Sequence, residues 1–334
     1  MNSIIFNLSR VAVVLALFVI VVGAYTRLSH AGLGCPDWPG CYGQLLVPET
    51  DAAVSAANEA YPERPLERDK AWIEMGHRYI AGILGLLILA ICAISWIKKT
   101  DSQTRFFASG LLLLVIFQAL LGMWTVTLLL KPFVVLLHLL GGMSIVSMLY
   151  WLSLHQRSKM RLTIPVSNEA LLPWSVFGII IVVLQISLGG WTSTNYAALA
   201  CPDFPSCHGV MWPEMNFGEA FVMWRGLGID YEGGVLDGPA RTAIHMAHRI
   251  GAILTLVCVS VVAIKAILQE VKQIRLAGIA IFVILGIQLS LGVANVVMTL
   301  PLYIAVAHNG VAALLLLSLV TLLHLSISKQ IRVN

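Results

Sequence analysis

Eight long apolar runs constrain the fold of this chain more than any other feature. A transmembrane helix needs about 20 consecutive, mainly apolar residues to cross the hydrocarbon core of a bilayer. Runs of about that length fall at residues 11–28, 72–97, 106–130, 132–154, 171–192, 240–268, 276–299 and 302–327. Only 11% of the 334 residues are charged, and the mean hydropathy of +0.86 lies outside the range of soluble proteins. The sequence therefore predicts an all-α integral membrane protein with eight transmembrane helices.

The distribution of charge predicts the orientation. Short connections between the second and third, fourth and fifth, and sixth and seventh runs carry Lys98, Lys99, Arg105, Arg157, Lys159, Arg161, Lys272 and Arg275. Basic loops face the cytoplasm. The long loop 29–70 holds seven acidic against three basic residues, and the loop 195–239 holds six against one, so both are expected outside. Both termini are then cytoplasmic, and the net charge of +4 reflects this topology rather than binding of nucleic acid.

The first apolar run resembles a cleaved signal peptide, because Arg10 precedes it. Two features favour a transmembrane helix instead. The run is somewhat longer than a usual signal core, and its end at 23–26, Gly-Ala-Tyr-Thr, recurs at 189–192 as Gly-Gly-Trp-Thr. We therefore predict that this segment is the first transmembrane helix.

The chain contains an internal duplication. The loop segment Cys-Pro-Asp-Trp-Pro-Gly-Cys at 35–41 returns as Cys-Pro-Asp-Phe-Pro-Ser-Cys at 201–207, and the second, third and fourth helices return as the sixth, seventh and eighth. Two four-helix halves, residues 1–155 and 171–334, are therefore expected on either side of a cytoplasmic linker at 156–170. Because each half begins inside and holds an even number of helices, the repeats are parallel, related by an axis along the membrane normal.

Four histidines occupy matching places in the duplication. They are His77, His138, His248 and His308, each five to seven residues from the expected outer end of its helix. At about 1.5 Å per residue, all four lie roughly 10 Å below the outer surface. A lone histidine in a helix is more often a hydrogen-bonded core residue than a ligand. Repetition at one depth in both halves, however, favours a binding function, since ionisable groups at membrane depth usually face a bundle interior or cavity.

The number of histidines in each half favours haem iron over a zinc or copper ion. Zinc or copper usually requires three or four ligands close together. Two histidines on opposite sides of a planar macrocycle are a common axial arrangement for haem iron, and facing helices of a bundle often supply such ligands. We therefore expect one haem between His77 and His138 and a second between His248 and His308.

Charged and polar side chains flank these histidines. Glu74 lies one turn before His77 and shares its helix face, so its carboxylate can take a proton or stabilise positive charge at a reacting carbon. Capping of the helix or contact with a haem propionate is the structural alternative. The second half has His245 at this position, for which outer-shell hydrogen bonding, propionate contact and iron ligation all stay open. Arg78 and Arg249 are expected to pair with haem propionates or to extend to the interface.

The six cysteines divide into two classes. Two lie in apolar helices and are expected to be small buried residues, Cys92 and Cys258. Four lie in the outward loops as Cys35 with Cys41 and Cys201 with Cys207. In an oxidising periplasm, the proline-containing segment between each pair lets it close a local disulfide. A structural staple is favoured over a redox role, because a disulfide carrier would leave the four histidines unexplained.

These motifs together resemble the haem A synthase family over essentially the whole chain: Glu-x-x-His-Arg in the second helix, His-Arg in the sixth, single histidines in the fourth and eighth, and cysteine pairs in the outward loops. The resemblance implies an oxidoreductase that converts the C8 methyl group of haem O to a formyl group through a hydroxymethyl intermediate. It also implies that His248 and His308 ligate a resident haem B, that His77 and His138 hold the substrate haem O, and that Glu74 is the catalytic carboxylate.

The implied setting is the cytoplasmic (inner) membrane of a bacterium, among membrane lipids, with haem O synthase and oxidase assembly factors as partners. Two other classes explain some of the residues. A cytochrome b-type protein that oxidises quinol would share the paired histidines but not the need for Glu74 beside one pair only. A haem transporter would use the parallel repeats, but a permeation route needs polar groups across the midplane. The electron acceptor, the oxygen source, the entry route of haem O and the oligomeric state, with a homo-oligomer as one option, stay open.

Overall fold

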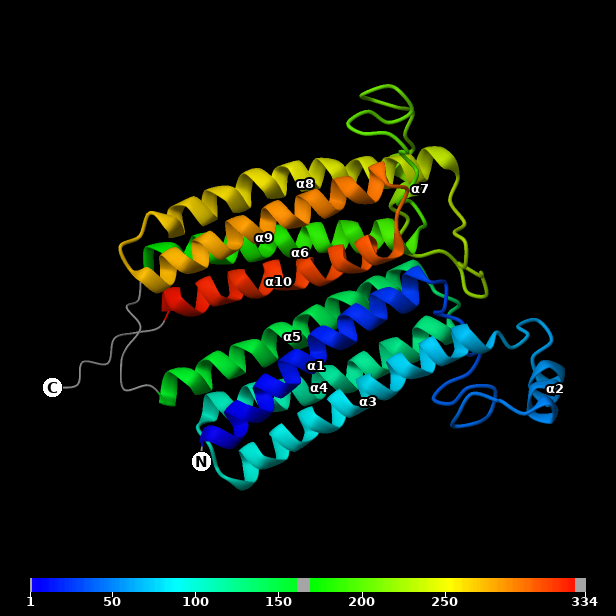
Figure 1. The fold of residues 1–334 in the computed structure, drawn as a ribbon, viewed down its shortest axis with the longest axis horizontal. Helices are drawn as coiled ribbons and strands as arrows, with labels where there is room; N and C mark the ends of the chain where they lie inside the picture. Colours follow the sequence, from blue (N-terminus) through cyan, green and yellow to red (C-terminus); the bar gives the residue numbers. More distant parts are fainter. Residues whose placement is uncertain (1, 161–168, 328–334) are drawn as a thin grey trace.

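The computed structural model describes residues 2–160 and 169–327. Within these residues, eight long apolar helices confirm the predicted fold class: α1 (Asn2–Leu28), α3 (Arg68–Ile97), α4 (Ser102–Thr127), α5 (Pro132–Met160), α6 (Leu172–Thr194), α8 (Gly238–Ile267), α9 (Lys272–Val297) and α10 (Leu302–Ile327). Shorter helices lie outside them: α2 (Asp51–Ala60), the 3-10 turn η1 (Glu169–Leu171) and α7 (Phe217–Ala220). The long helices run side by side, with α2 and α7 at one end, while α1 begins and α10 ends at the other (Figure 1).

Several helices extend beyond the apolar runs that predicted them. Helix α1 begins at Asn2 and α3 at Arg68, because an apolar run marks only the part at hydrocarbon depth, whereas the backbone hydrogen bonds continue into the polar interface. At the start of α8, the Asp237 carboxylate accepts a hydrogen bond from the backbone N–H of Ala240. Helix α5 continues into the predicted linker, and residues 161–168 of that linker lie outside the described residues.

The helices associate as two groups of four. Helices α1, α3, α4 and α5 pack on one another, as do α6, α8, α9 and α10 (Figure 1). The groups meet where α1 and α5 contact α10 and α5 contacts α6. At Gly190 in α6, an added Cβ would lie 2.8 Å from side-chain atoms of Leu136 and Leu139 in α5, so a larger residue there would displace these leucine side chains. Near the other end, the Tyr150 and Thr321 hydroxyls are 2.9 Å apart across the same seam.

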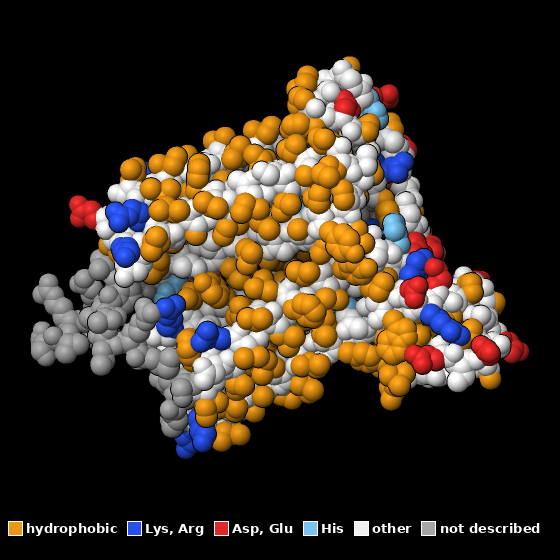
Figure 2. Space-filling view, viewed as in Figure 1, with side chains coloured by type: hydrophobic (Ala, Val, Ile, Leu, Met, Phe, Trp, Pro, Cys, Tyr) orange, Lys and Arg blue, Asp and Glu red, His pale blue; other side chains and the backbone are white. Residues whose placement is uncertain are grey.

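The surface has apolar sides and charged ends, as a membrane-spanning bundle requires. Hydrophobic side chains cover the sides of the long helices (Figure 2). Lys and Arg side chains gather at the end where α1 begins, and most of the visible Asp and Glu side chains lie at the end that carries the long loops (Figure 2). This separation agrees with the predicted direction of insertion.

One segment of the second half lies across the outer end of the first half. We call this segment, residues 221–234, the outer crossover. Its Tyr231 N–H donates to the carbonyl of Leu129 in the α4–α5 connection at 3.1 Å. Its Asp230 and Glu232 carboxylates pair with Arg64 at 2.6 and 3.0 Å. The outer loops therefore connect the two halves in addition to the helix seam.

The Lys131 side chain binds the outer crossover. Its side chain is only 2% exposed, although it carries an ammonium group. The Nζ donates to the carbonyl oxygens of Arg225 at 2.7 Å and Gly226 at 3.1 Å, and it lies 3.2 Å from the centre of the Trp224 ring. Two carbonyl acceptors and an aromatic face compensate for the loss of water around this charge.

Candidate functional site

The structure brings the four predicted histidines together in two pairs. His77 of α3 and His138 of α5 lie within electrostatic range of each other, as do His248 of α8 and His308 of α10. Each pair thus comes from two helices of one half. The same positions in both halves of the chain therefore form equivalent constellations.

Every one of these imidazoles lies against a glycine of a neighbouring helix. The nearest distances from an added glycine Cβ to a ring atom are 2.9 Å for Gly23 to His77, 3.3 Å for Gly122 to His138, 3.1 Å for Gly189 to His248 and 3.2 Å for Gly292 to His308. Contacts this short leave no room for a larger residue unless the ring moves. The glycines therefore fix how closely the first helix and the third helix of each half approach the rings.

The ring nitrogens have unused hydrogen-bonding capacity. The Nδ1 atoms of His77, His138 and His308 are buried and have no hydrogen-bond partner among the described residues. An unpaired polar atom in an apolar interior is costly, so the described side chains alone do not satisfy these three rings. Within the described part of the chain, no three His, Cys, Asp or Glu side chains form a metal-binding group. Paired imidazoles with glycines beside them fit a haem with two axial ligands.

Glu74 is held in place by two donors. Its side chain is buried, with Oε2 accepting from the backbone N–H of Cys35 at 2.9 Å and Oε1 accepting from Arg78 Nη2 at 2.5 Å. Arg78 Nη1 in turn donates to the carbonyls of Asp37 at 3.0 Å and Gly40 at 2.5 Å. Glu74 and Arg78 therefore anchor the outer disulfide loop to α3.

The second half repeats this anchor with different chemistry. His245 is buried, and its Nδ1 lies 3.0 Å from the Ala197 carbonyl and 3.4 Å from the Cys201 N–H, the equivalent of the amide that Glu74 binds. Arg249 donates to the carbonyls of Asp203 and Ser206, each at 2.8 Å. Arg78 and Arg249 thus donate hydrogen bonds to loop carbonyls. The pairing of either residue with a haem propionate stays a prediction.

The two disulfide loops are built alike. Disulfides join Cys35 to Cys41 and Cys201 to Cys207, as predicted, while Cys92 and Cys258 are free. In the first loop, the Asp37 carboxylate accepts from the N–H groups of Tyr42 at 2.6 Å and Gly43 at 2.7 Å. In the second, Asp203 accepts from those of His208 at 2.6 Å and Gly209 at 3.0 Å. The Ser206 hydroxyl and the Gly209 N–H lower the pKa of Asp203 to about 2.

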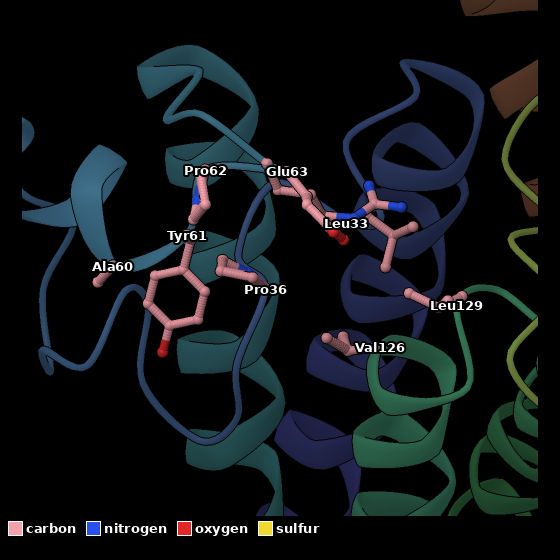
Figure 3. Close-up of a pocket in the computed structure, with 9 residues that line it drawn as sticks. Leu33, Pro36, Ala60, Tyr61, Pro62, Glu63, Val126 and Leu129 are labelled. Carbon is pink, nitrogen blue, oxygen red and sulfur yellow. The ribbon is translucent and has the colours of Figure 1, made fainter.

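A pocket opens at the outer end of the first half. Its volume is about 410 Å³, and its lining includes Leu33, Pro36, Tyr61, Val126 and Leu129, which surround it in Figure 3. Pro36 directly follows Cys35, whose amide binds Glu74. Burial and the neighbouring Glu67 carboxylate raise the pKa of Tyr42, in the same loop, to about 12, so its hydroxyl stays protonated at neutral pH.

The COX15-CtaA family model, described as cytochrome oxidase assembly protein, matches residues 7–320. The chain belongs to this family. It is 47% identical to a haem A synthase of Shewanella oneidensis over 315 residues, which is 94% of each chain. It is also similar to the haem A synthases of Bacillus licheniformis, at 26% identity over 92% of this chain and 91% of the relative, and of Methylobacterium radiotolerans, at 27% over 90% and 84%.

The contacts that glutamines make to the histidines of this COX15-CtaA chain were not predicted from the sequence, and Gln185 is the clearest case. Gln185 lies in α6 among apolar residues, with its Nε2 3.0 Å from Nδ1 of His248. The signal was available, because an amide in the middle of an apolar transmembrane helix needs a partner from another helix. The sequence does not indicate which helix supplies it.

Proposed function

We propose that this COX15-CtaA protein is a haem A synthase that holds haem O between His77 and His138 and a resident haem B between His248 and His308. It oxidises the C8 methyl group of haem O to a formyl group through a hydroxymethyl intermediate, for cytochrome oxidase assembly. The observation that carries the proposal is the pair of buried imidazoles in each half, every ring against a glycine, in a chain 47% identical to a haem A synthase.

The second half holds the resident cofactor in this proposal. A haem held by His248 and His308 would supply one-electron redox chemistry when bound. The surrounding α6, α8, α9 and α10 contribute an apolar core that includes Val262, Ile281 and Leu319. His248 and His308 would hold the iron.

The first half holds the substrate and the catalytic carboxylate. Glu74 lies one helical turn outward of His77, so it projects toward the edge of a macrocycle held by His77 and His138. The Cys35 N–H and Arg78 fix its position. There the carboxylate accepts a proton released from the oxidised group or stabilises positive charge at the methyl carbon. The second half, with His245 at this place, lacks that carboxylate.

The protein is placed in the cytoplasmic membrane with both termini inside and its disulfide loops outside. Two observations support this orientation: the basic side chains at one end of the bundle and the two disulfides at the other. Haem O must come from a haem O synthase in the same membrane, and the product must pass to oxidase assembly factors.

Extraction of the pigments from purified protein tests the proposal. Mass analysis should find haem B together with haem O, its hydroxymethyl form and haem A. The double variant His77→Ala, His138→Ala should retain haem B and lose the other three. Haem B alone in the unaltered protein, from cells that make haem O, would contradict the synthase and favour an electron-transfer cytochrome.

A further inference from the structure

Gln185 contacts the Nδ1 atom of His248, and the Nδ1 atoms of the other three histidines lack such a contact, although Gln288 Nε2 lies 3.3 Å from Nε2 of His308. Gln185 Nε2 lies 3.0 Å from Nδ1 of His248 and 3.0 Å from the His248 carbonyl oxygen. The Nδ1 atoms of His77, His138 and His308 have no partner among the described residues. The amide therefore fixes the rotation of one imidazole about its side-chain bonds, and only in the second half.

A glycine on the facing helix creates the space for this amide. A Cβ added to Gly251 of α8 would lie 2.3 Å from Gln185 Oε1 and 2.8 Å from a methyl carbon of Leu188. Both distances are far shorter than van der Waals contact. Gly251 lies one turn inward of His248 on the same helix, so the ring, the amide and the glycine form one packed unit.

The first half lacks both members of this unit. Alignment of the repeats places Val19 where α6 has Gln185 and Ile80 where α8 has Gly251. Neither side chain can form a hydrogen bond. The difference is not a consequence of the shared scaffold, because the neighbouring ring contacts, Gly23 to His77 and Gly189 to His248, are the same in both halves.

We propose that Gln185 is a positioning residue for His248 that sets the ring orientation and the donor strength of this iron ligand, and so the redox potential of the haem at that site. The inference rests on the proposed function, in which His248 ligates haem. A ligating histidine usually bonds its second ring nitrogen to a protein group that fixes its tautomer and raises its basicity.

The glutamine amide suits this role in both states of the ligand. Without iron, a proton on Nε2 of His248 leaves Nδ1 to accept from Gln185 Nε2. With iron on Nε2, the proton resides on Nδ1 and needs an acceptor. Gln185 carries that acceptor in Oε1, which is buried without a partner, and rotation of the amide exchanges the two groups.

Redox titration and electron paramagnetic resonance of the purified full-length protein test the proposal. Gln185→Met keeps the size of the side chain and removes the acceptor, so the midpoint potential of the second-half haem should rise, its low-spin g values should shift, and its haem affinity should fall about tenfold. Gln185→Glu supplies a stronger acceptor and should lower the potential. Val19→Met, the matched change in the first half, should leave the potential and g values of the second-half haem unaltered.

Gly251→Ala is an independent test of the Gln185 amide, because it displaces the amide without altering the histidine. It should reproduce the effect of Gln185→Met, and the double variant should add little. His248→Ala tests the ligand role of His248 separately from the positioning role of Gln185. Loss of the low-spin signal in His248→Ala, with unchanged potential and g values in both Gln185 variants, would overturn the positioning role alone. Retention of that signal would overturn the ligand assignment and this inference with it.

Discussion

The two halves share a scaffold, and three of their differences around the histidine of the second long helix alter its polar contacts and packing. The first half has Glu74, Val19 and Ile80, whereas the second has His245, Gln185 and Gly251. In the second half a hydrogen bond fixes the orientation of the imidazole, while His77 has no partner at Nδ1. A resident group benefits from a preorganised ligand, whereas a substrate must enter and leave. Under the proposed function, the duplication supplied two similar sites, and these substitutions suit the second to a resident group and the first to a substrate.

The largest effect should come from the ligands themselves. His248→Ala or His308→Ala removes one axial ligand and should abolish the low-spin haem B signal in the absorption spectrum of the purified protein. His77→Ala or His138→Ala should leave this signal in place and abolish haem A formation, because the proposed function assigns the substrate to these residues. Comparison of all four variants at equal protein level makes each half the control for the other.

An unchanged spectrum in both His248→Ala and His308→Ala would remove the assignment of the resident haem. Loss of haem B in the first-half variants would contradict the division of labour between the halves, even if the synthase activity stands.

The second effect concerns Glu74. Glu74→Gln keeps the shape and can still accept from the Cys35 N–H, but it removes the base and the negative charge. Haem A formation should fall about 10²-fold or more, the usual scale for a positioned acid or base, with both haem sites intact. His245→Gln should be milder. Haem analysis of cells with equal amounts of each variant gives the comparison.

The structural contacts sharpen this test, because Glu74 accepts from the amide of the first cysteine in its loop and His245 lies 3.4 Å from the equivalent amide. If loop anchoring were the whole role of Glu74, the two substitutions would cause similar losses of haem A and of thermal stability. Near-normal haem A from Glu74→Gln would exclude the catalytic assignment, and loss of bound haem would make Glu74 a structural residue.

The sequence predicted what depends on local pattern and repetition. Apolar length specified the helices, and the cysteine spacing specified the disulfides, because both are short-range properties. It did not predict that the Arg78 and Arg249 side chains turn toward loop carbonyls. The residues next to a helix do not reveal where a loop that is distant in the sequence comes back to contact that helix. Gln185 and His248 are 63 positions apart, and only the packing of α6 on α8 joins them.

The outer crossover is a further asymmetry, and it should depend on Lys131. The duplication places Pro301 at this position in the second half. Lys131→Met fills most of the same volume but removes the charged donor to the part-buried Arg225 and Gly226 carbonyls, and a hydrogen bond to a charged group contributes roughly 1.5–3 kcal/mol. Limited proteolysis within residues 221–234 should therefore accelerate about tenfold.

Arg64→Ala is the matched control for this segment. Its partners Asp230 and Glu232 are partly exposed, with side-chain exposures of 50% and 34%, so the loss of these ion pairs should change proteolysis far less. Equal acceleration in both variants would mean that the ion pairs, rather than the buried ammonium group, hold the outer crossover.

The smallest effect should be the acid sensitivity of the second disulfide loop. The pKa of Asp203 is lowered from 3.8 to about 2 by the Ser206 hydroxyl and by the N–H groups of Gly209 and His208. A carboxylate with a lowered pKa in the folded loop stabilises the loop fully above its ordinary pKa, and this contribution is lost as the pH falls from about 4 through 2. Protection of the His208 and Gly209 amides against hydrogen exchange, corrected for intrinsic rates, should therefore decrease over this interval. In Asp203→Asn the protection should be reduced by a few-fold at pH 7 and should show no such step, because the amide side chain does not titrate. A step of equal size in the variant would assign the acid sensitivity to another group.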